Sequence, residues 1–290
     1  MDEFNSALLK KLYIPPHDSH KGQNGKVMVI AGSQLFHAAA LWSLEAAAHI
    51  VDMVYFSSVP ENNQIVEQAK KQFRNGIVVP RTKIDDYIQE ADSILIGPGL
   101  PRIEGQEAKD DDTREMTERL LKKYPDKKWV IDGGSLQVMD PEWIPKNAIL
   151  TPHAREYEIL FKDQIRQLAD KDPNEIQQTV YEKARKYNCI IVLKGSTDIV
   201  CAPDLPAGRQ GQCVTISGGN AGMTKGGTGD VLAGVALALY AKNDAFLSAC
   251  AASYFNKKAG EKLFKTKGYW YSTSELLNEI PSVMKETILQ

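Results

Sequence analysis

The sequence predicts an α/β fold with a mostly parallel sheet that is covered by helices on both faces. Short apolar runs rich in Val, Ile and Leu alternate with longer segments of helical periodicity along most of the chain. This alternation is typical of βαβ units. A chain of 290 residues with 43% hydrophobic residues can bury a core without disulfides or metals. Because no low-complexity linker interrupts the alternation, we expect a single domain over residues 1–290.

The strands and helices are expected in a regular order. Strands are expected at 26–30, 53–56, 76–79, 93–96, 129–131, 148–150 and 189–193, followed by a hairpin of 199–201 with 213–216. Helices are expected at 37–51, 61–71, 84–90, 110–123, 155–161 and 174–187, and over much of the chain from Asp230 onward.

Composition and charge exclude several kinds of partner. Lys and Arg total 35 against 37 Asp and Glu, so the net charge of −2 gives no general attraction to nucleic acid or anionic membranes. The chain starts with acidic residues, and its longest apolar run, 231–241, is shorter than the roughly 20 residues of a membrane span. The four cysteines form no Cys-x-x-Cys pair, which disfavours a zinc site. We therefore expect a cytoplasmic protein with reduced thiols, in which Cys189 and Cys250 are buried.

Glycines and polar residues follow several of the expected strands. In open α/β sheets, ligands bind at the carboxyl ends of the strands. One such turn is explained by the conformational freedom of glycine alone, but several on one chain predict a single ligand-binding edge. The turns are Gly32-Ser33, Gly97-Pro98-Gly99, Asp132-Gly133-Gly134, His153 and Lys194-Gly195.

The segment 217–235, SGGNAGMTKGGTGDVLAGV, carries the strongest functional signal. Its glycines precede an apolar helix, so backbone N–H groups can converge on an anion, and the helix dipole favours the same charge. The spacing is not that of a Walker A loop. Asp230 then stands where it can act as a base for a hydroxyl nucleophile while the glycines hold a phosphoryl group. The structural alternative is that Thr228 or Asp230 simply caps the helix.

Three further residues have both a functional and a structural interpretation. Lys194 could meet a phosphate as a point charge, or lie solvated at a strand end. His153 could bind a ligand, or begin a helix with Glu156 in its first turn and Thr151 as its cap. A metal pair of His153 and Glu156 would lack a third ligand. Asp132 could bind a ribose hydroxyl or Mg²⁺, or form a turn before two glycines.

Six motifs in one order carry a family resemblance. They are Lys21-Gly22-Gln23-Asn24-Gly25, Ala31-Gly32-Ser33, Gly97-Pro98-Gly99, Thr151-Pro152-His153-x-x-Glu156, Val192-Leu193-Lys194-Gly195 and Gly219-Asn220-Ala221-Gly222-Met223-x-x-Gly226-Gly227-Thr228-Gly229-Asp230. With them the chain resembles the ADP/ATP-dependent NAD(P)H-hydrate dehydratases of the ribokinase-like superfamily, in the stand-alone form without an epimerase domain.

The resemblance implies a ribokinase-like three-layer α/β/α sandwich and the repair of hydrated nicotinamide cofactors. ADP or ATP phosphorylates the hydroxyl of NADHX or NADPHX, and elimination of phosphate restores NADH or NADPH, which is a hydro-lyase reaction. By the resemblance, Asp230 is the catalytic base and also contacts the hydrate, together with Ala39, Gly99 and His153. Mg²⁺ accompanies the nucleotide, we assign no metal ligand, and the relatives suggest a homotetramer. The implied nucleotide contacts are Lys194, Gly195, Ser196, Thr197, Asp198, Gly226, Gly227, Thr228 and Gly229.

The chain departs from the family pattern at four places. Phe36-His37-Ala38-Ala39-Ala40 replaces a frequent Tyr-x-Gly-Ala-Ala, and Asp132-Gly133-Gly134 replaces Asp-Ala-Asp. Lys225 stands where a small hydroxyl residue is common and could add a phosphate contact. Residues 205–212 look like an insertion between two strands.

Two other functions compete with the dehydratase. A small-molecule kinase of the same superfamily, acting on a hydroxymethylpyrimidine, thiazole or sugar alcohol, shares the Gly-Thr-Gly-Asp segment. The segment 21–25 and the Thr151-Pro152-His153 motif favour the dehydratase. A non-catalytic nucleotide-binding module would need the glycines but not Asp230. The sequence does not distinguish ADP from ATP, or NADHX from NADPHX.

Overall fold

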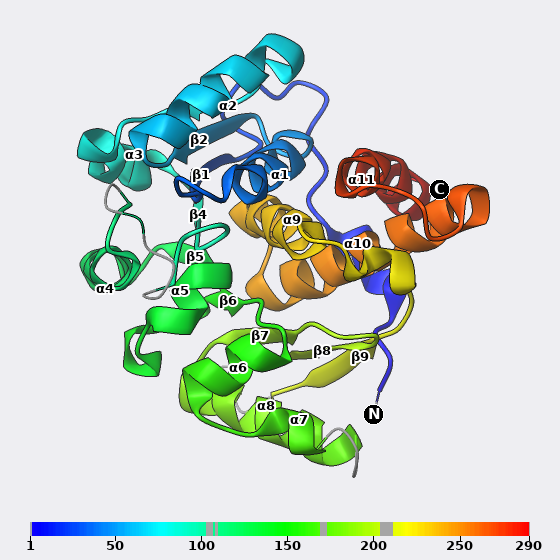
Figure 1. The fold of residues 1–290 in the computed structure, drawn as a ribbon. Helices are drawn as coiled ribbons and strands as arrows, with labels where there is room; N and C mark the ends of the chain where they lie inside the picture. Colours follow the sequence, from blue (N-terminus) through cyan, green and yellow to red (C-terminus); the bar gives the residue numbers. More distant parts are fainter. Residues whose placement is uncertain (1, 103–106, 108–109, 169–172, 204–210, 290) are drawn as a thin grey trace.

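A nine-stranded sheet runs through the described part of the protein, which in this computed structural model comprises residues 2–102, 107, 110–168, 173–203 and 211–289 (Figure 1). The strand order is β3-β2-β1-β4-β5-β6-β7-β8-β9. Neighbouring strands are parallel from β3 to β7, whereas β8 pairs antiparallel with both β7 and β9. The strands are β1 (Lys26–Ile30), β2 (Met53–Ser57), β3 (Ile77–Val78), β4 (Ser93–Ile96), β5 (Lys128–Ile131), β6 (Ile149–Leu150), β7 (Ile190–Leu193), β8 (Asp198–Cys201) and β9 (Cys213–Ile216).

Helices cover both faces of this sheet and complete three layers (Figure 1). One buried apolar cluster joins the sheet to α1 (His37–Ala48), α9 (Thr228–Lys242), α10 (Ala245–Lys267) and α11 (Thr273–Ile288). A second cluster on the opposite face joins it to α3 (Ile84–Glu90), α4 (Thr113–Lys123), α5 (Gly133–Val138), α6 (Ala154–Phe161) and α8 (Pro173–Lys186). The remaining elements are α2 (Pro60–Phe73), α7 (Ile165–Leu168) and the 3₁₀ turns η1 (Ser6–Lys11), η2 (Arg81–Lys83), η4 (Pro141–Trp143) and η5 (Ala221–Thr224).

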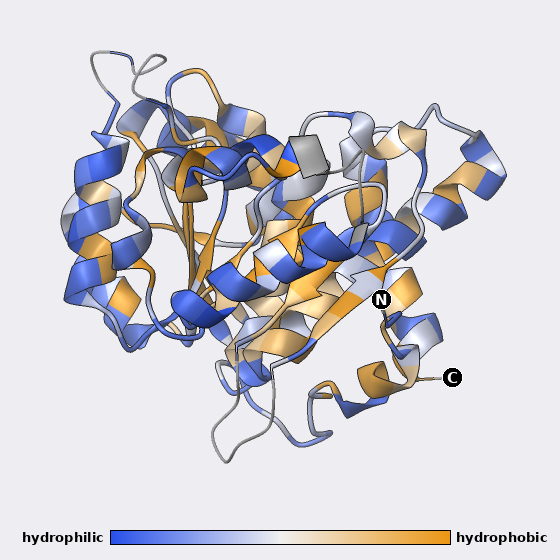
Figure 2. Ribbon diagram, turned by 90° about the horizontal axis from the view of Figure 1, so that it is seen from below, coloured by the Kyte–Doolittle hydropathy of each residue, from blue (hydrophilic) through white to orange (hydrophobic). Residues whose placement is uncertain are grey.

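The central strands are buried on both faces, which explains why they read as continuous apolar runs. In β1, Val27 and Val29 belong to the first cluster, whereas Met28 and Ile30 belong to the second. Hydrophobic residues accordingly concentrate in the sheet and on the inner sides of the helices (Figure 2). The helix α9 is buried throughout 231–241 because it packs against the sheet, α1 and α10. Even so, no helix in the described ranges combines the length and apolarity needed to cross a membrane.

The predicted element order is confirmed, with ends that differ by no more than three residues. The sequence-based prediction missed α5, because Asp132-Gly133-Gly134 reads as a turn and the helix that follows is short. It also missed η1, whose Leu9 is fully buried in the first cluster.

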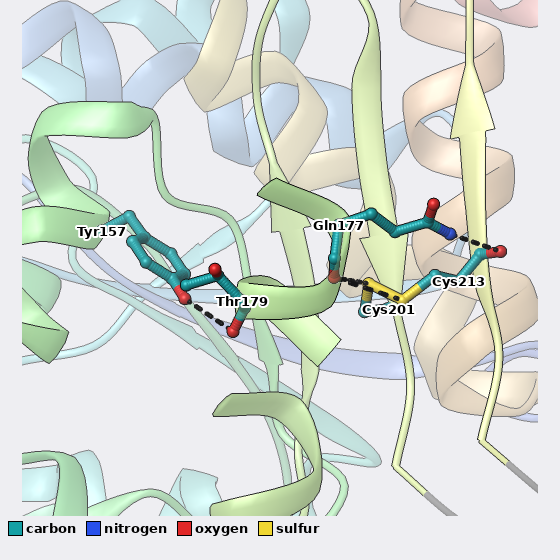
Figure 3. The surroundings of a disulfide bond; sticks show 5 residues. All are labelled: Tyr157, Gln177, Thr179, Cys201 and Cys213. Atoms are coloured by element: carbon teal, nitrogen blue, oxygen red, sulfur yellow. Dashed lines mark hydrogen bonds between the residues drawn. A yellow bond between two sulfur atoms is a disulfide. The ribbon is translucent and has the colours of Figure 1, made fainter. Parts of the chain in front are cut away.

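The expectation that all cysteines are reduced thiols is wrong for two of them. Cys201 in β8 and Cys213 in β9 form a disulfide (Figure 3). The antiparallel register places these two residues directly opposite each other, which brings their side chains together. Both sulfurs lie against the carbonyl oxygen of Gln177 in α8, at 3.8 and 4.0 Å. Cys189 and Cys250 are free and buried, as expected. Most of the 205–212 insertion lies outside the described residues.

Candidate active site

The turns that follow β1, β4 and β5 meet at one edge of the sheet, as predicted. The N–H of Gly32 donates to the carbonyl of Pro98 at 2.8 Å, and the N–H of Gly134 donates to Gly97 at 3.0 Å. Gly97 has a φ of +124°, and a Cβ there would lie 1.7 Å from the carbonyl oxygen of Asp132. Only glycine allows this approach, so the three turns form a continuous surface.

Lys194 lies among carboxylates at this edge. Its Nζ is 2.8 Å from Oδ1 of Asp132 and 3.9 Å from Oε2 of Glu156. The same ammonium lies over Gly229, where a Cβ would be 3.1 Å from Nζ. Lys194 therefore joins the turn after β5, the first turn of α6 and the first turn of α9, which also carries Asp230.

Two carboxylic acids in this cluster have strongly raised pKa values. Burial raises the pKa of Asp230 to about 7, the negative charges of Asp132 and Glu156 add to this, and Lys194 opposes it. Burial likewise raises the pKa of Glu156 to about 7, against the opposing effect of Lys194. Burial alone would lower the pKa of Lys194, but its carboxylate neighbours outweigh burial and hold that pKa above the usual lysine range. Carboxyl groups whose pKa values lie near neutral pH can accept and donate protons at that pH, so they suit acid–base chemistry.

His153 has a structural role that the sequence offered as its second interpretation. It is the N-cap of α6: its Nδ1 accepts from the N–H of Glu156 at 3.2 Å, and Oε2 of Glu156 accepts from the N–H of His153 at 2.9 Å. The predicted cap, Thr151, is therefore wrong, because the helix begins two residues later. The imidazole is still half exposed, and burial together with the charge of Lys194 lowers its pKa. His153 thus lies at the same edge with its imidazole half exposed, and its Nε2 is 3.5 Å from Oε1 of Glu156.

The glycine-rich segment forms the expected cluster of backbone donors. Gly227 is the N-cap of α9 with a φ of +99°. The structural alternative of a Thr228 or Asp230 cap is wrong, because no side chain caps this helix and the Thr228 hydroxyl donates to the carbonyls of Met223 and Lys225. Among the residues that the structure describes, no N–H group of 226–230 donates to a protein acceptor. These donors, which we call the cradle, are available to an anion.

A cavity of about 520 Å³ lies beside the cradle. Six of the predicted nucleotide contacts line it, namely Lys194, Gly195, Ser196, Asp198, Thr228 and Gly229. Thr197, Gly226 and Gly227 do not line it, and neither do Ala39, Gly99, His153 and Asp230. Its volume falls in the range of small-molecule sites. Gly229 in the first turn of α9 thus lines the cavity, and Asp230 follows it directly in the chain.

Asp198 is placed by the structure as a support for the loop after β7. It is buried, its Oδ1 accepts from the N–H of Gly195 at 2.9 Å, and its Oδ2 accepts from the Ser253 hydroxyl at 2.6 Å. Lys257 in α10 completes this arrangement, because its Nζ donates to the carbonyls of Gly195 and Ser196 at 3.0 and 2.9 Å and lies 3.3 Å from Asp198. Lys257 was not predicted from the sequence, because it is one of several lysines in α10 and nothing in the pattern distinguishes it.

Lys225 does not reach toward the cradle. Its Nζ donates to the carbonyl of Tyr269 at 2.7 Å and to that of Gly222 at 3.2 Å. The suggested phosphate contact is thus replaced by a tie between the glycine-rich segment and the loop before α11.

Ala39 and Gly99, two of the predicted hydrate contacts, lie in direct contact with each other. Gly99 has a φ of +65°, and a Cβ there would be 3.1 Å from that of Ala39. The hydroxyl of Ser43 donates to the carbonyls of both Ala39 and Asp230, at 3.0 and 3.1 Å. These contacts bring Ala39, Gly99 and Asp230 together, and Lys194 links them to His153.

Comparison with known proteins shows which family this chain is similar to. The family model described as Carb_kinase, NAD(P)H-hydrate dehydratase, matches residues 27–282. The ADP-dependent (S)-NAD(P)H-hydrate dehydratase of Nitrosopumilus maritimus is 33% identical over 97% of this chain and 96% of its own length. The Bifunctional NAD(P)H-hydrate repair enzyme Nnr of Methanocaldococcus jannaschii is 35% identical over 96% of this chain. The chain spans about half the length of the bifunctional relatives, 51% in that case.

Solved structures agree on the fold. A ribokinase-like superfamily protein of Enterococcus faecalis superposes with a TM-score of 0.81 at 23% identity, covering 100% of this chain and 97% of its own. The ADP/ATP-dependent NAD(P)H-hydrate dehydratase of Bacillus subtilis, co-crystallised with ATP and Mg²⁺, gives 0.78 at 22% identity, covering 99% and 98%. At these identities the likeness establishes a ribokinase-like fold, and the match of the family model over most of the sequence goes further: the chain belongs to the NAD(P)H-hydrate dehydratase family.

Proposed function

We propose that this protein is an ADP- or ATP-dependent dehydratase that returns NADHX and NADPHX to NADH and NADPH. The observation that carries the proposal is the position of Asp230. It lies in the first turn of α9, directly after Gly229, which lines the 520 Å³ cavity. Its backbone carbonyl shares the Ser43 hydroxyl with the carbonyl of Ala39, which is in contact with Gly99. A base at this position lies between a bound nucleotide and a bound hydroxyl compound. Family membership supports the choice of substrate.

Asp230 acts as the base in the proposed reaction. Its carboxylate accepts the proton of the hydrate's hydroxyl while that oxygen attacks the terminal phosphoryl group of the nucleotide. The cradle N–H groups stabilise the charge on the transferred group. The resulting phosphate ester then loses phosphate as the ring nitrogen donates its electron pair. Loss of a proton from the neighbouring ring carbon restores the double bond.

The two substrates are assigned to opposite sides of Asp230. Ala39, Gly99 and the half-exposed His153 are proposed to contact the hydrate. The nucleotide occupies the cavity, with its phosphates toward Lys194 and the cradle. Thr197, Gly226 and Gly227 do not line the cavity, and they are proposed to contact the part of the nucleotide that extends beyond it. Asp198 acts in this proposal through the loop that it holds, because its carboxylate oxygens already accept from Gly195 and Ser253.

Mg²⁺ fits the chemistry of this edge. Magnesium is usually held by one or two carboxylates together with substrate phosphates and water. The carboxylates at this edge that could contribute to such a site are those of Asp132 and Glu156, which lie 2.8 and 3.9 Å from Nζ of Lys194. No group of three metal-ligating side chains is present in the described ranges, so the nucleotide would supply the other ligands. The ion would neutralise phosphate charge during transfer.

ADP is the donor that the relatives favour. The Nitrosopumilus maritimus relative, which matches this chain over nearly its full length, is ADP-dependent by name. The alternative, a kinase for hydroxymethylpyrimidine or thiazole alcohols, shares the fold and the cradle, but the family match favours the dehydratase.

One assay separates these functions. The protein is incubated with NADHX, Mg²⁺ and ADP or ATP, and absorbance of the reduced nicotinamide ring is followed. Recovery that depends on the nucleotide supports the dehydratase. Phosphorylation of a pyrimidine or thiazole alcohol, without recovery from NADHX, supports the kinase. Binding of ADP without either reaction supports a nucleotide-binding module.

We also propose a one-domain, homo-oligomeric, cytoplasmic enzyme. The continuous sheet supports one domain. The disulfide removes one argument for the cytoplasm, because such bonds are uncommon in most reducing compartments. Light scattering after size-exclusion chromatography tests the tetramer.

A further inference from the structure

The cradle is held by two helices that are far from it in sequence. The hydroxyl of Thr273, the first residue of α11, donates to the carbonyl of Gly226 at 2.8 Å. The indole of Trp42 in α1 lies against Gly227, where a Cβ would be 2.1 Å from Cζ3. The two supports are themselves joined, because Nε1 of Trp42 donates to the hydroxyl of Ser274 at 3.2 Å.

These contacts bear on the conformation that makes the cradle. Gly227 has a φ of +99°, so its peptide planes are held in a left-handed conformation by their surroundings rather than by regular secondary structure. The Gly226 carbonyl accepts a hydrogen bond from Thr273, which fixes the orientation of the peptide group between Gly226 and Gly227. The N–H groups at 226–230 have no protein acceptor and so depend on this support for their direction.

We infer that Thr273 and Trp42 are positioning residues for phosphoryl transfer, acting through Gly226 and Gly227. This inference rests on the proposed function. Neither residue needs to touch the nucleotide, since Thr273 is buried and neither lines the cavity. Small displacements of preorganised N–H donors weaken the stabilisation of the charge on the transferred phosphoryl group. We therefore expect the loss mainly in kcat.

Thr273→Val is the sharpest test. Valine keeps the shape of threonine but lacks the hydroxyl, so the Gly226 carbonyl loses its partner. We expect kcat to fall about tenfold or more, with the dissociation constant for ADP changing less than about threefold. Thr273→Ser keeps a hydroxyl and should restore most of the turnover. Trp42→Ala should lower kcat similarly, and Trp42→Phe should retain part of it.

Thr287→Val is the matched control. Thr287 lies in the same helix and its hydroxyl donates to the carbonyl of Val283 at 2.8 Å, far from the cradle. It should reduce stability about as much as Thr273→Val while leaving kcat unchanged. Equal turnover in Thr273→Val and the wild type, or an equal loss in the Thr287→Val control, would overturn the inference. If the wild type binds no ADP and restores no NADH, the proposed function itself fails.

Discussion

Nζ of Lys194 donates a hydrogen bond to Oδ1 of Asp132 at 2.8 Å, across the turns after β7 and β5. Both groups are largely removed from water, and Glu156 and Asp230 add negative charge near Lys194. The lysine that the sequence suggests for a phosphate therefore also balances the charge of a group of carboxylates. Nζ of Lys194 also lies over Gly229, and Lys194 lines the cavity. A phosphate bound there can therefore pair with the same ammonium group.

Replacing Lys194 by Met should affect both stability and activity. Asp132 would remain buried without its partner, which costs about 3 kcal/mol of unfolding free energy. The pKa of Asp230 should rise further, since Lys194 lowers it. We therefore expect the acidic limb of the pH–rate profile to move to higher pH. Lys128→Met is the control, because Lys128 is also partly buried but donates to the carbonyl of Tyr240 at the far end of the sheet. An unmoved profile in Lys194→Met would contradict this account.

Asp230→Asn should separate binding from chemistry. The amide keeps the shape of the side chain but cannot take a proton, so turnover should fall by roughly 10²–10⁴. Calorimetric titration with ADP should show little loss of affinity, because the cradle and the cavity stay intact. Unchanged turnover in this variant would remove Asp230 from the mechanism.

The same substitution should stabilise the protein at neutral and higher pH. The pKa of Asp230 is about 7 in the folded state against 3.8 ordinarily, so the folded state binds the proton more tightly. Stability from this group is therefore greatest below about pH 4 and declines as pH rises toward 7. At pH 8, Asp230→Asn should unfold with a free energy larger by on the order of 2–4 kcal/mol. Denaturant unfolding should find the gain much reduced at pH 4.5, and a gain that does not depend on pH would contradict the cause given.

The disulfide should stabilise the hairpin of β8 and β9. Cross-linking Cys201 with Cys213 closes a loop with a sequence separation of 12, and the chain-entropy estimate for such a loop is about 3 kcal/mol. We expect the free energy of unfolding of the double variant Cys201→Ser, Cys213→Ser to be lower by about that amount, so that it unfolds at a lower denaturant concentration. A reductant should lower the stability of the wild type toward that of the variant and leave the variant unchanged. Wild-type stability that a reductant does not alter would show that the bond contributes little.

The sequence alone determined the local features of this protein. Apolar runs and helical periodicity predicted the order of elements, because strands that are buried on both faces of a parallel sheet consist almost entirely of apolar residues. The glycines before Asp230 predicted the cradle, since glycine permits the left-handed backbone conformation that Gly227 adopts where the helix begins.

Only the tertiary structure decided which side chains meet. The hydrogen-bond partners of Lys194, Asp198 and Lys225 lie on other elements. Spacing along the chain therefore does not reveal that Asp198 and Lys225 support loops. The pairing of Cys201 with Cys213 follows from strand register, and the support of Gly226 by Thr273 follows from the docking of α11. Such contacts depend on how the layers pack, and the raised pKa of Asp230 depends on the burial that this packing produces.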